Sequence, residues 1–189
     1  MWYVLDGEVN FGDQTCTAGT CIFIPADAAY GPITAPKGVT LLRYADSGGG
    51  APVDGERIRQ QRVIGANPAT ALFVNERDIA VVKTGHGTAK YLVGDPRRRG
   101  PNVIIRFWGP QANLPVHSHP FTEMWYVLQG EVNFGSAMCG QGTCIFIPPG
   151  DVYGPITAPK GVTLLRYAAD GEAAVDWEQV RRKQGAGST

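Results

Sequence analysis

The stretch Pro115–Gly130 reads PVHSHPFTEMWYVLQG and places two histidines and one glutamate close together in the chain. His117 and His119 are two positions apart, and side chains of a strand alternate between its faces, so both imidazoles are predicted to point the same way. A proline ends that strand, and Glu123 opens the next one with Trp125 on its own face. If the two strands pair as a hairpin, the carboxylate lies beside the two imidazoles.

This trio of side chains predicts a metal site. Two neutral nitrogens and one hard oxygen suit a divalent ion, with Fe(II) favoured and Zn(II), Mn(II) or Ni(II) as alternatives. Three ligands on one side of the ion leave positions open for water, dioxygen or a chelating substrate. The alternative is a surface hairpin whose histidines only form hydrogen bonds.

An internal repeat organises the rest of the chain. Residues 1–45 return at 124–168 with a constant offset, and 35 of the 45 positions are identical. A weaker likeness continues beyond the second copy, so the repeated unit is longer than this segment. We therefore predict an incomplete repeat over 1–62, holding only the second half of a unit, and a complete domain over 63–189. Whether the chain begins at its true start or is part of a longer protein with two complete domains stays open.

The local patterns predict an all-β fold. Short stretches rich in Val, Ile, Phe, Tyr and Thr alternate with Gly, Pro and Asn at a spacing typical of antiparallel barrels and sandwiches. The expected strands of the complete domain are Ile79–Lys83, Val103–Trp108, Met124–Leu128, Glu131–Phe134, Thr143–Ile147 and Val162–Tyr167. Helical character is confined to Ala173–Lys183 and, more weakly, Asp54–Arg62.

Two motifs of the complete domain resemble those of the cupin superfamily. The pattern H-x-H-x3-E-x6-G, here His117, His119, Glu123 and Gly130, is similar to the first cupin motif, and GTCIFIPPGDVY at 142–153 is similar to the second. The resemblance implies a double-stranded β-barrel of the jelly-roll type, with a metal inside and commonly a homodimer. It departs from the family pattern at Tyr153, which stands where the final histidine is usual, and at Thr157, where asparagine is usual.

Three further residues are candidates for the chemistry of the site. Tyr153 is the candidate catalytic residue: it ligates the metal weakly, hydrogen-bonds a metal-bound water, or packs with its hydroxyl outward. Trp125 shares the face of Glu123 and is expected to line the cavity and bind substrate. Arg106 lies inside a predicted strand and is the best cation for a carboxylate-bearing ligand, although a salt bridge at the strand end is an equal alternative.

Composition narrows the partners. Lysine plus arginine equals aspartate plus glutamate, at 17 each, so no long-range field attracts nucleic acid or an anionic membrane. No apolar run approaches the length of about 18 residues that spans a bilayer, and the first ten residues lack the order of a signal peptide. These features predict a cytoplasmic protein without nucleic-acid or membrane partners. The pairs Cys16/Cys21 and Cys139/Cys144 are expected to be reduced thiols or, less simply, cross-hairpin disulfides.

The sequence leaves two functional classes open. One is a non-haem metal-dependent oxygenase, or a related lyase or isomerase, acting on a small polar organic molecule. The other is a non-catalytic sensor that binds a metal or a small molecule, so whether the protein is an enzyme is undecided, and a purely structural remnant is the third alternative. The first copy lacks any counterpart of the three metal-ligand candidates, so one metal per chain is expected. Its apolar strands, including Trp2, Val4, Ile22 and Ile24, predict association with a second chain as a homodimer.

Overall fold

The computed structural model describes residues 1–26, 28, 30–45, 71–171 and 175–176. The chain divides into two compact units, Met1–Asp78 and Ile79–Thr189. The domain boundary predicted at residue 62 lies outside the described residues. Within the described residues the only helix is the short 3-10 turn η1 (Glu76–Asp78), and no helix is long and apolar enough to cross a membrane.

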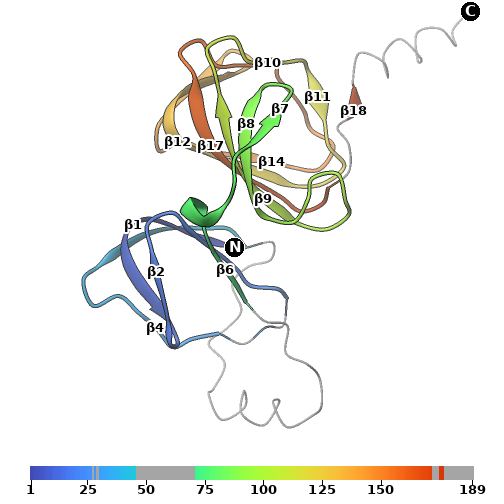
Figure 1. Cartoon of the computed structure of the whole chain (residues 1–189). Helices are drawn as coiled ribbons and strands as arrows, with labels where there is room; N and C mark the ends of the chain where they lie inside the picture. Colours follow the sequence, from blue (N-terminus) through green and yellow to red (C-terminus); the bar gives the residue numbers. More distant parts are fainter. Residues whose placement is uncertain (27, 29, 46–70, 172–174, 177–189) are drawn as a thin grey trace, which may run out of the picture. The chain divides into compact units, whose positions relative to one another are not determined.

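The second unit is built on one continuous antiparallel sheet that curls round on itself (Figure 1). Its first layer has the strand order β14-β12-β17-β9-β8-β7. The bounds are Cys144–Ile147 (β14), Glu123–Phe134 (β12), Val162–Ala168 (β17), Asn102–Trp108 (β9), Gly87–Val93 (β8) and Val82–Thr84 (β7). The strands predicted at Val103–Trp108, Thr143–Ile147 and Val162–Tyr167 are confirmed, and their ends agree to within about two residues.

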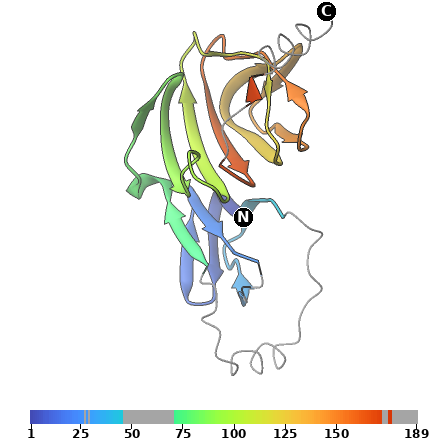
Figure 2. The same ribbon diagram turned by 90° about the vertical axis from the view of Figure 1, so that its right-hand side faces the viewer.

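The far half of β12 belongs to a second layer, which closes the barrel opposite the first (Figure 2). There it pairs with β13 (Ala137–Gly140) and β16 (Ile156–Thr157), and β16 pairs with β10 (Asn113–Leu114). A separate small sheet has β11 (His117–Ser118) between β15 (Val152–Tyr153) and β18 (Val175–Asp176). The all-β barrel predicted from the sequence is confirmed.

One long strand replaces the two short strands expected at 124–128 and 131–134. β12 passes through Gly130 after a register shift between Val127 and Gln129. Gly130 has φ +83°, and a Cβ there would lie 2.6 Å from the carbonyl oxygen of Gly161, so only glycine lets the two backbones approach this closely. The bulge turns β12 from one layer into the other, which a pattern of side chains does not reveal.

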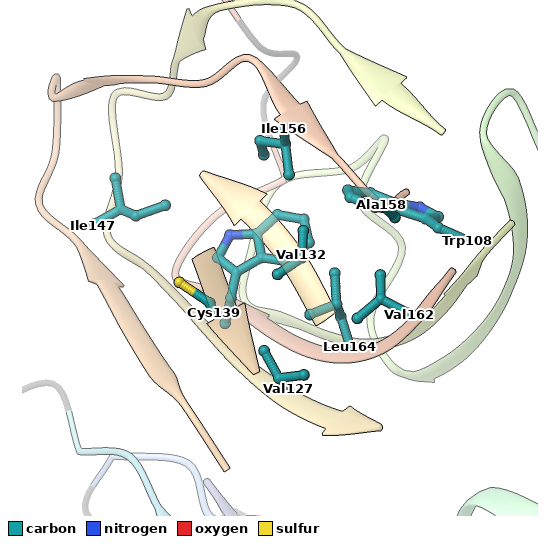
Figure 3. Close-up of a cluster of buried hydrophobic side chains, with 10 residues drawn as sticks. Trp108, Val127, Val132, Cys139, Ile147, Ile156, Ala158, Val162 and Leu164 are labelled. Atoms are coloured by element: carbon teal, nitrogen blue, oxygen red, sulfur yellow. The ribbon is translucent and has the colours of Figure 1, made fainter. Parts of the chain in front are cut away.

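Apolar side chains from both layers fill the barrel of the second unit. Figure 3 shows them projecting into the space that the strands enclose. The cluster consists of Trp108, Trp125, Val127, Val132, Cys139, Ile147, Ile156, Ala158, Val162 and Leu164. Each fully buried aliphatic side chain stabilises the fold by about 1.5–3 kcal/mol relative to exposure. The polar candidates described below line one end of this core.

The first unit repeats part of this architecture. β1 (Trp2–Phe11) pairs with β2 (Gln14–Thr17), β3 (Thr20–Phe23), β4 (Ile33–Thr34) and β5 (Val39–Arg43). A further strand, β6 (Leu72–Asn75), pairs with the outer edge of β3. Val4 and Ile22 are fully buried here, so these two side chains already have cover within their own unit.

Part of the predicted C-terminal helix is wrong. Val175–Asp176 forms strand β18, because its backbone pairs with His117 and Ser118 of β11 and this pairing overrides a weak helical periodicity. The remainder of Ala173–Lys183, and all of Asp54–Arg62, lie outside the described residues. All four cysteines are free thiols, so the alternative of cross-hairpin disulfides is wrong.

Candidate functional site

His117 enters the site from the short strand β11, which is held on both sides by β15 and β18. Its ring Nδ1 lies 2.7 Å from the carbonyl oxygen of Pro115, which can only accept a hydrogen bond, so Nδ1 carries the proton. The lone pair of the neutral ring is then on Nε2. A backbone carbonyl that fixes the tautomer in this way is a common support for metal-binding histidines.

The ring of His119 stands at 88° to that of His117, with ring centroids 5.4 Å apart. Burial, more than any nearby charge, lowers the pKa of His119 to about 4, so its imidazole is neutral near pH 7. The ring stacks on Phe121, and its Nδ1 has no hydrogen-bond partner among the described residues. His119 is therefore a partly buried, neutral ring with an uncommitted nitrogen.

Glu123 is fully buried at the start of β12, and its Oε1 lies 3.8 Å from Nε2 of His119. Nε of Arg166 donates to that same oxygen at 2.6 Å, and Nη2 of Arg166 donates to it as well. The hydroxyl of Tyr153 donates to the other oxygen. Burial acts to raise the pKa of Glu123, but Arg166, His119 and the hydrogen bond from Tyr153 outweigh it, so the pKa is lowered and the group is ionised.

Arg166 is the functional-site residue that sequence reasoning missed. It is 4% exposed, and Asn102 of the neighbouring strand accepts a hydrogen bond from its Nη1 at 3.0 Å. One signal was present: a single charged residue lies in the otherwise uncharged strand Val162–Ala168. Buried charges are paired, so an arginine buried in such a strand requires a carboxylate nearby, but the same residues surround the exposed Arg43, and the pattern alone does not show which arginine is buried.

No three His, Cys, Asp or Glu side chains of the described ranges are grouped as a metal site in their present positions. Both oxygens of Glu123 already accept hydrogen bonds. Each carboxylate oxygen has about two acceptor positions. The oxygen that accepts from Tyr153 therefore retains capacity for a cation, whereas the one held by two Arg166 nitrogens does not. Two imidazole nitrogens and the Glu123 oxygen that accepts from Tyr153 are donor types that suit a divalent ion.

Tyr153 faces the site, so the alternative in which its hydroxyl points outward is wrong. Its ring centroid lies 4.4 Å from that of His117, and its hydroxyl donates to Glu123. Burial raises the pKa of the phenol strongly, and the adjacent Glu123 carboxylate raises it further. The phenol thus keeps its proton throughout the physiological range.

Trp125 and Arg106 lie together. Two guanidinium groups are close to the indole of Trp125: the Cζ atoms of Arg106 and Arg166 lie 5.8 and 5.6 Å from its ring centroid. Trp108 packs beside it at 5.7 Å. Nε of Arg106 and Nε1 of both indoles are buried without an acceptor in the part of the chain that the structure describes. Burial and the charge of Arg166 lower the pKa of Arg106 to about 10, so it stays charged at pH 7.

A surface hollow of about 450 Å³ lies away from these side chains. It is lined by Gly85–Gly87 and Gly109–Asn113, which include the exposed His86 but none of the candidate residues. The chemistry-bearing groups are on β9, β11, β12, β15 and β17 instead. We therefore place the candidate site inside the barrel and not at this hollow.

Comparison with known proteins bears on the fold alone. No protein-family profile and no curated protein sequence matches the chain. Solved structures do: a proposed dioxygenase from Nostoc punctiforme PCC 73102 superposes with a TM-score of 0.66 at 14% identity, over 91% of this chain and 62% of that one. The chain has a cupin fold.

Smaller proteins match only part of the chain. An RmlC-like cupin from Shewanella frigidimarina NCIMB 400 is 21% identical over 49% of this chain and 85% of its own, with a TM-score of 0.42. The polyketide cyclase RemF from Streptomyces resistomycificus is 22% identical over 54% of this chain and 82% of its own, with a TM-score of 0.45. The superposition of the Nostoc structure confirms the barrel fold predicted from the two sequence motifs, and at such low identity the function does not follow from it.

Proposed function

We propose that the second unit binds a small polar organic molecule inside its barrel, next to a divalent metal ion held by His117, His119 and Glu123. The observation that carries the proposal is the closeness of the three donor side chains: Nε2 of His119 lies 3.8 Å from Oε1 of Glu123, whose other oxygen still has room for a cation, and the rings of His117 and His119 are 5.4 Å apart. The tautomer of His117, set by the Pro115 carbonyl, adds a second nitrogen lone pair. Two imidazoles and a carboxylate suit Fe(II) first, and Zn(II), Mn(II) or Ni(II) next.

A divalent ion in this place supplies Lewis acidity toward the oxygens of a bound molecule. The protein's own groups do the rest. Arg166 neutralises and orients Glu123 from one side, and Tyr153 holds a proton at its hydroxyl on the other side. We propose Tyr153 as the catalytic residue because its hydroxyl, beside Glu123, is in place to hydrogen-bond a water or a substrate oxygen at the site.

Arg106 and Trp125 are the proposed substrate contacts. Both have buried N–H groups without an acceptor among the described residues, and a buried donor left unpaired costs about 1–3 kcal/mol. A ligand that presents oxygen atoms removes that cost. Arg106 and Arg166 together carry two positive charges against the one carboxylate of Glu123, which favours a ligand with a carboxylate or an enolate-like oxygen.

Oxygenation is the reaction class to test first, with lyase and isomerase reactions next. The support is an analogy of fold, since the Nostoc structure that superposes over 91% of this chain is described as a proposed dioxygenase. A sensor that binds the same molecule without turnover uses the same residues. The two are distinguished by product formation and not by binding.

The decisive experiment is elemental analysis of the full chain purified without a metal-binding tag, combined with an oxygen-uptake screen over small carboxylates and ketones. We expect about one metal per chain. His117→Ala and His119→Ala should each abolish it, because two remaining ligands hold a divalent ion poorly. His86→Ala, in an exposed loop, is the matched control and should retain the metal. Two metals per chain, or retention in the double variant, contradicts the proposal.

A second candidate is metal-free binding of a small organic anion. The specific observation in its favour is that Arg166 and Tyr153 already occupy both oxygens of Glu123. In that case a carboxylate ligand binds the chelator-treated protein, its binding survives His119→Ala, and Arg106→Gln removes it. Binding that requires both the metal and the histidines supports the first candidate instead.

A further inference from the structure

Two strands of this protein have the same sequence but different neighbours. The segment TCIF occurs at Thr20–Phe23, which is β3, and at 143–146, where β14 begins one residue later. Each strand pairs antiparallel with its own long strand in the same register, Tyr3 opposite Cys21 and Tyr126 opposite Cys144. The inner edges of β3 and β14 are therefore equivalent.

The outer edge of β3 carries β6. In that pairing Phe23, Ile22 and Cys21 lie opposite Leu72, Phe73 and Val74. Phe73 packs on the core cluster that contains Ile22. The side chain of Asn75 donates to Thr20 Oγ1 at 3.0 Å, and the backbone N–H of Glu76 donates to the carbonyl of Gly19 at 3.0 Å.

The outer edge of β14 pairs with no strand in the described ranges. Its side chains show the consequence. Cys21 and Ile22 are fully buried in β3, whereas the matching Cys144 is exposed and Ile145 is only partly buried. Phe146 is 59% exposed. An uncovered edge with apolar side chains is a template for pairing with another strand.

The groups that receive β6 in the first unit are also present beside β14. Thr143 and Gly142 take the places of Thr20 and Gly19, and Tyr126 takes the place of Tyr3, whose pKa is raised by burial and then by the charge of Glu76. At Gly19 the atoms of Glu76 approach to 3.0 Å of a Cβ position, while at Gly142 the nearest atom is 4.0 Å away. The space that an acidic residue fills in the first unit is therefore open in the second.

We propose that β14 is the docking edge for an extended strand of a partner polypeptide with the pattern of β6, Leu-Phe-Val-Asn followed by an acidic residue. The strand runs antiparallel to β14. Its phenylalanine packs beside Ile145, its aliphatic residues lie beside Phe146 and Cys144, and its asparagine binds Thr143. Main-chain hydrogen bonds give the affinity, and the alternating side chains give the specificity.

A second copy of this chain is a poorer source of that strand. Each chain has two such edges and a single β6 in its described part, so a β6 that moved to another molecule's β14 would uncover its own β3. Exchange of β6 between two copies therefore leaves the number of uncovered strand edges unchanged. A β6-like strand from a partner polypeptide covers β14 without uncovering β3, independently of what the barrel binds.

The test uses the full chain and a synthetic peptide of residues 71–78, ALFVNERD, as the probe. Cys16, Cys21 and Cys139 are buried and Cys144 is exposed, so an aromatic disulfide reagent should react first at Cys144. We expect a saturating amount of the peptide to slow that reaction at least tenfold, as β6 shields Cys21, with the modified residue located by mass spectrometry. A peptide of the same composition in scrambled order should give no protection.

Substitutions test whether the peptide binds at the outer edge of β14. Phe146→Asp should weaken binding of the fluorescent peptide at least tenfold by anisotropy, whereas Met138→Asp, at a 73% exposed apolar residue on β13, should leave it unchanged. Three results overturn the proposal. They are an unchanged rate at Cys144 with millimolar peptide, equal protection by the scrambled peptide, and a dimer by sedimentation whose Cys144 is unreactive before any peptide is added.

Discussion

The two copies, residues 1–45 and 124–168, are identical at 35 of 45 positions, and yet some of the identical side chains lie in different environments. Arg43 is exposed and lies over the ring of Trp2 at 5.2 Å, whereas Arg166 is 4% exposed and paired with Glu123. Tyr30 is 44% exposed, and Tyr153 reaches the same glutamate. The difference comes from the chain that precedes the second copy, because Glu123 and β9 have no counterpart among the described residues of the first unit.

Substitution of the equivalent arginines Arg166 and Arg43 should give the largest difference in the free energy of unfolding. Arg166→Met leaves Glu123 buried without its ion partner, and we expect a loss of about 3–5 kcal/mol in the free energy of unfolding. Arg43→Met removes only an exposed contact with Trp2, which is expected to cost less than about 1 kcal/mol. Urea denaturation followed by tryptophan fluorescence measures both. Similar losses in the two variants would mean that Arg166 is not the partner of a buried charge.

For the equivalent isoleucines Ile22 and Ile145, the larger loss of stability is expected in the first copy. Ile22 is fully buried between β1 and β6, so Ile22→Ala should cost about 2–5 kcal/mol. Ile145 sits on the uncovered strand and is partly buried, so Ile145→Ala should cost clearly less. The comparison requires unfolding curves for the chain alone. A larger loss at Ile145 than at Ile22 would show that β14 is covered in solution.

The tyrosine pair should give a smaller difference, in function more than in stability. Tyr153→Phe removes the hydrogen bond to Glu123 but keeps the ring beside His117, so metal affinity is expected to stay within about tenfold while turnover or ligand binding changes. Tyr30→Phe is the matched control and should change neither. Metal titration with a competing chelator decides the outcome, and a far larger loss of metal at Tyr153→Phe would make the phenol a ligand.

The smallest effect concerns a loop found only in the complete copy. Hydrogen bonds from the backbone of Gly100 and Gly171, followed by Arg99, lower the pKa of Asp170 below its usual range. A lowered folded-state pKa means that this stabilisation is present above the unfolded value of about 3.9 and is lost as the pH falls through the folded value. Asp170→Asn should therefore lower Tm slightly at pH 7, and the difference should disappear near pH 2. A constant difference at both pH values would contradict this assignment.

The fold was largely predictable from the sequence. The alternation of β-branched residues with Gly and Pro marked the strands, and the spacing of His117, His119 and Glu123 marked the family's barrel. The path of β12 through Gly130 was not predictable in the same way, because the bulge depends on the approach of Gly161 from another strand. Local pattern carries no information on such a contact.

The pairings within the candidate site were not predictable from the sequence. The motif indicated Glu123 but gave no sign that Arg166 and Tyr153 would share its carboxylate. The reason is that the letters around Arg166 and Arg43 are the same, VTLLRYA in both copies. Identical local sequence cannot distinguish a buried ion pair from an exposed arginine, since the partner lies elsewhere in the chain. The covering of β3 by β6 escaped prediction for the same reason.

The central claim is that the barrel of the second unit holds one metal ion at His117, His119 and Glu123. X-ray diffraction from crystals of the full chain, recorded on both sides of the absorption edge of the metal found by elemental analysis, tests it most directly. The account predicts one anomalous peak per chain, in contact with an imidazole nitrogen of each histidine and with the oxygen of Glu123 that accepts from Tyr153. No peak in metal-loaded crystals, or a peak away from these three side chains, would contradict it.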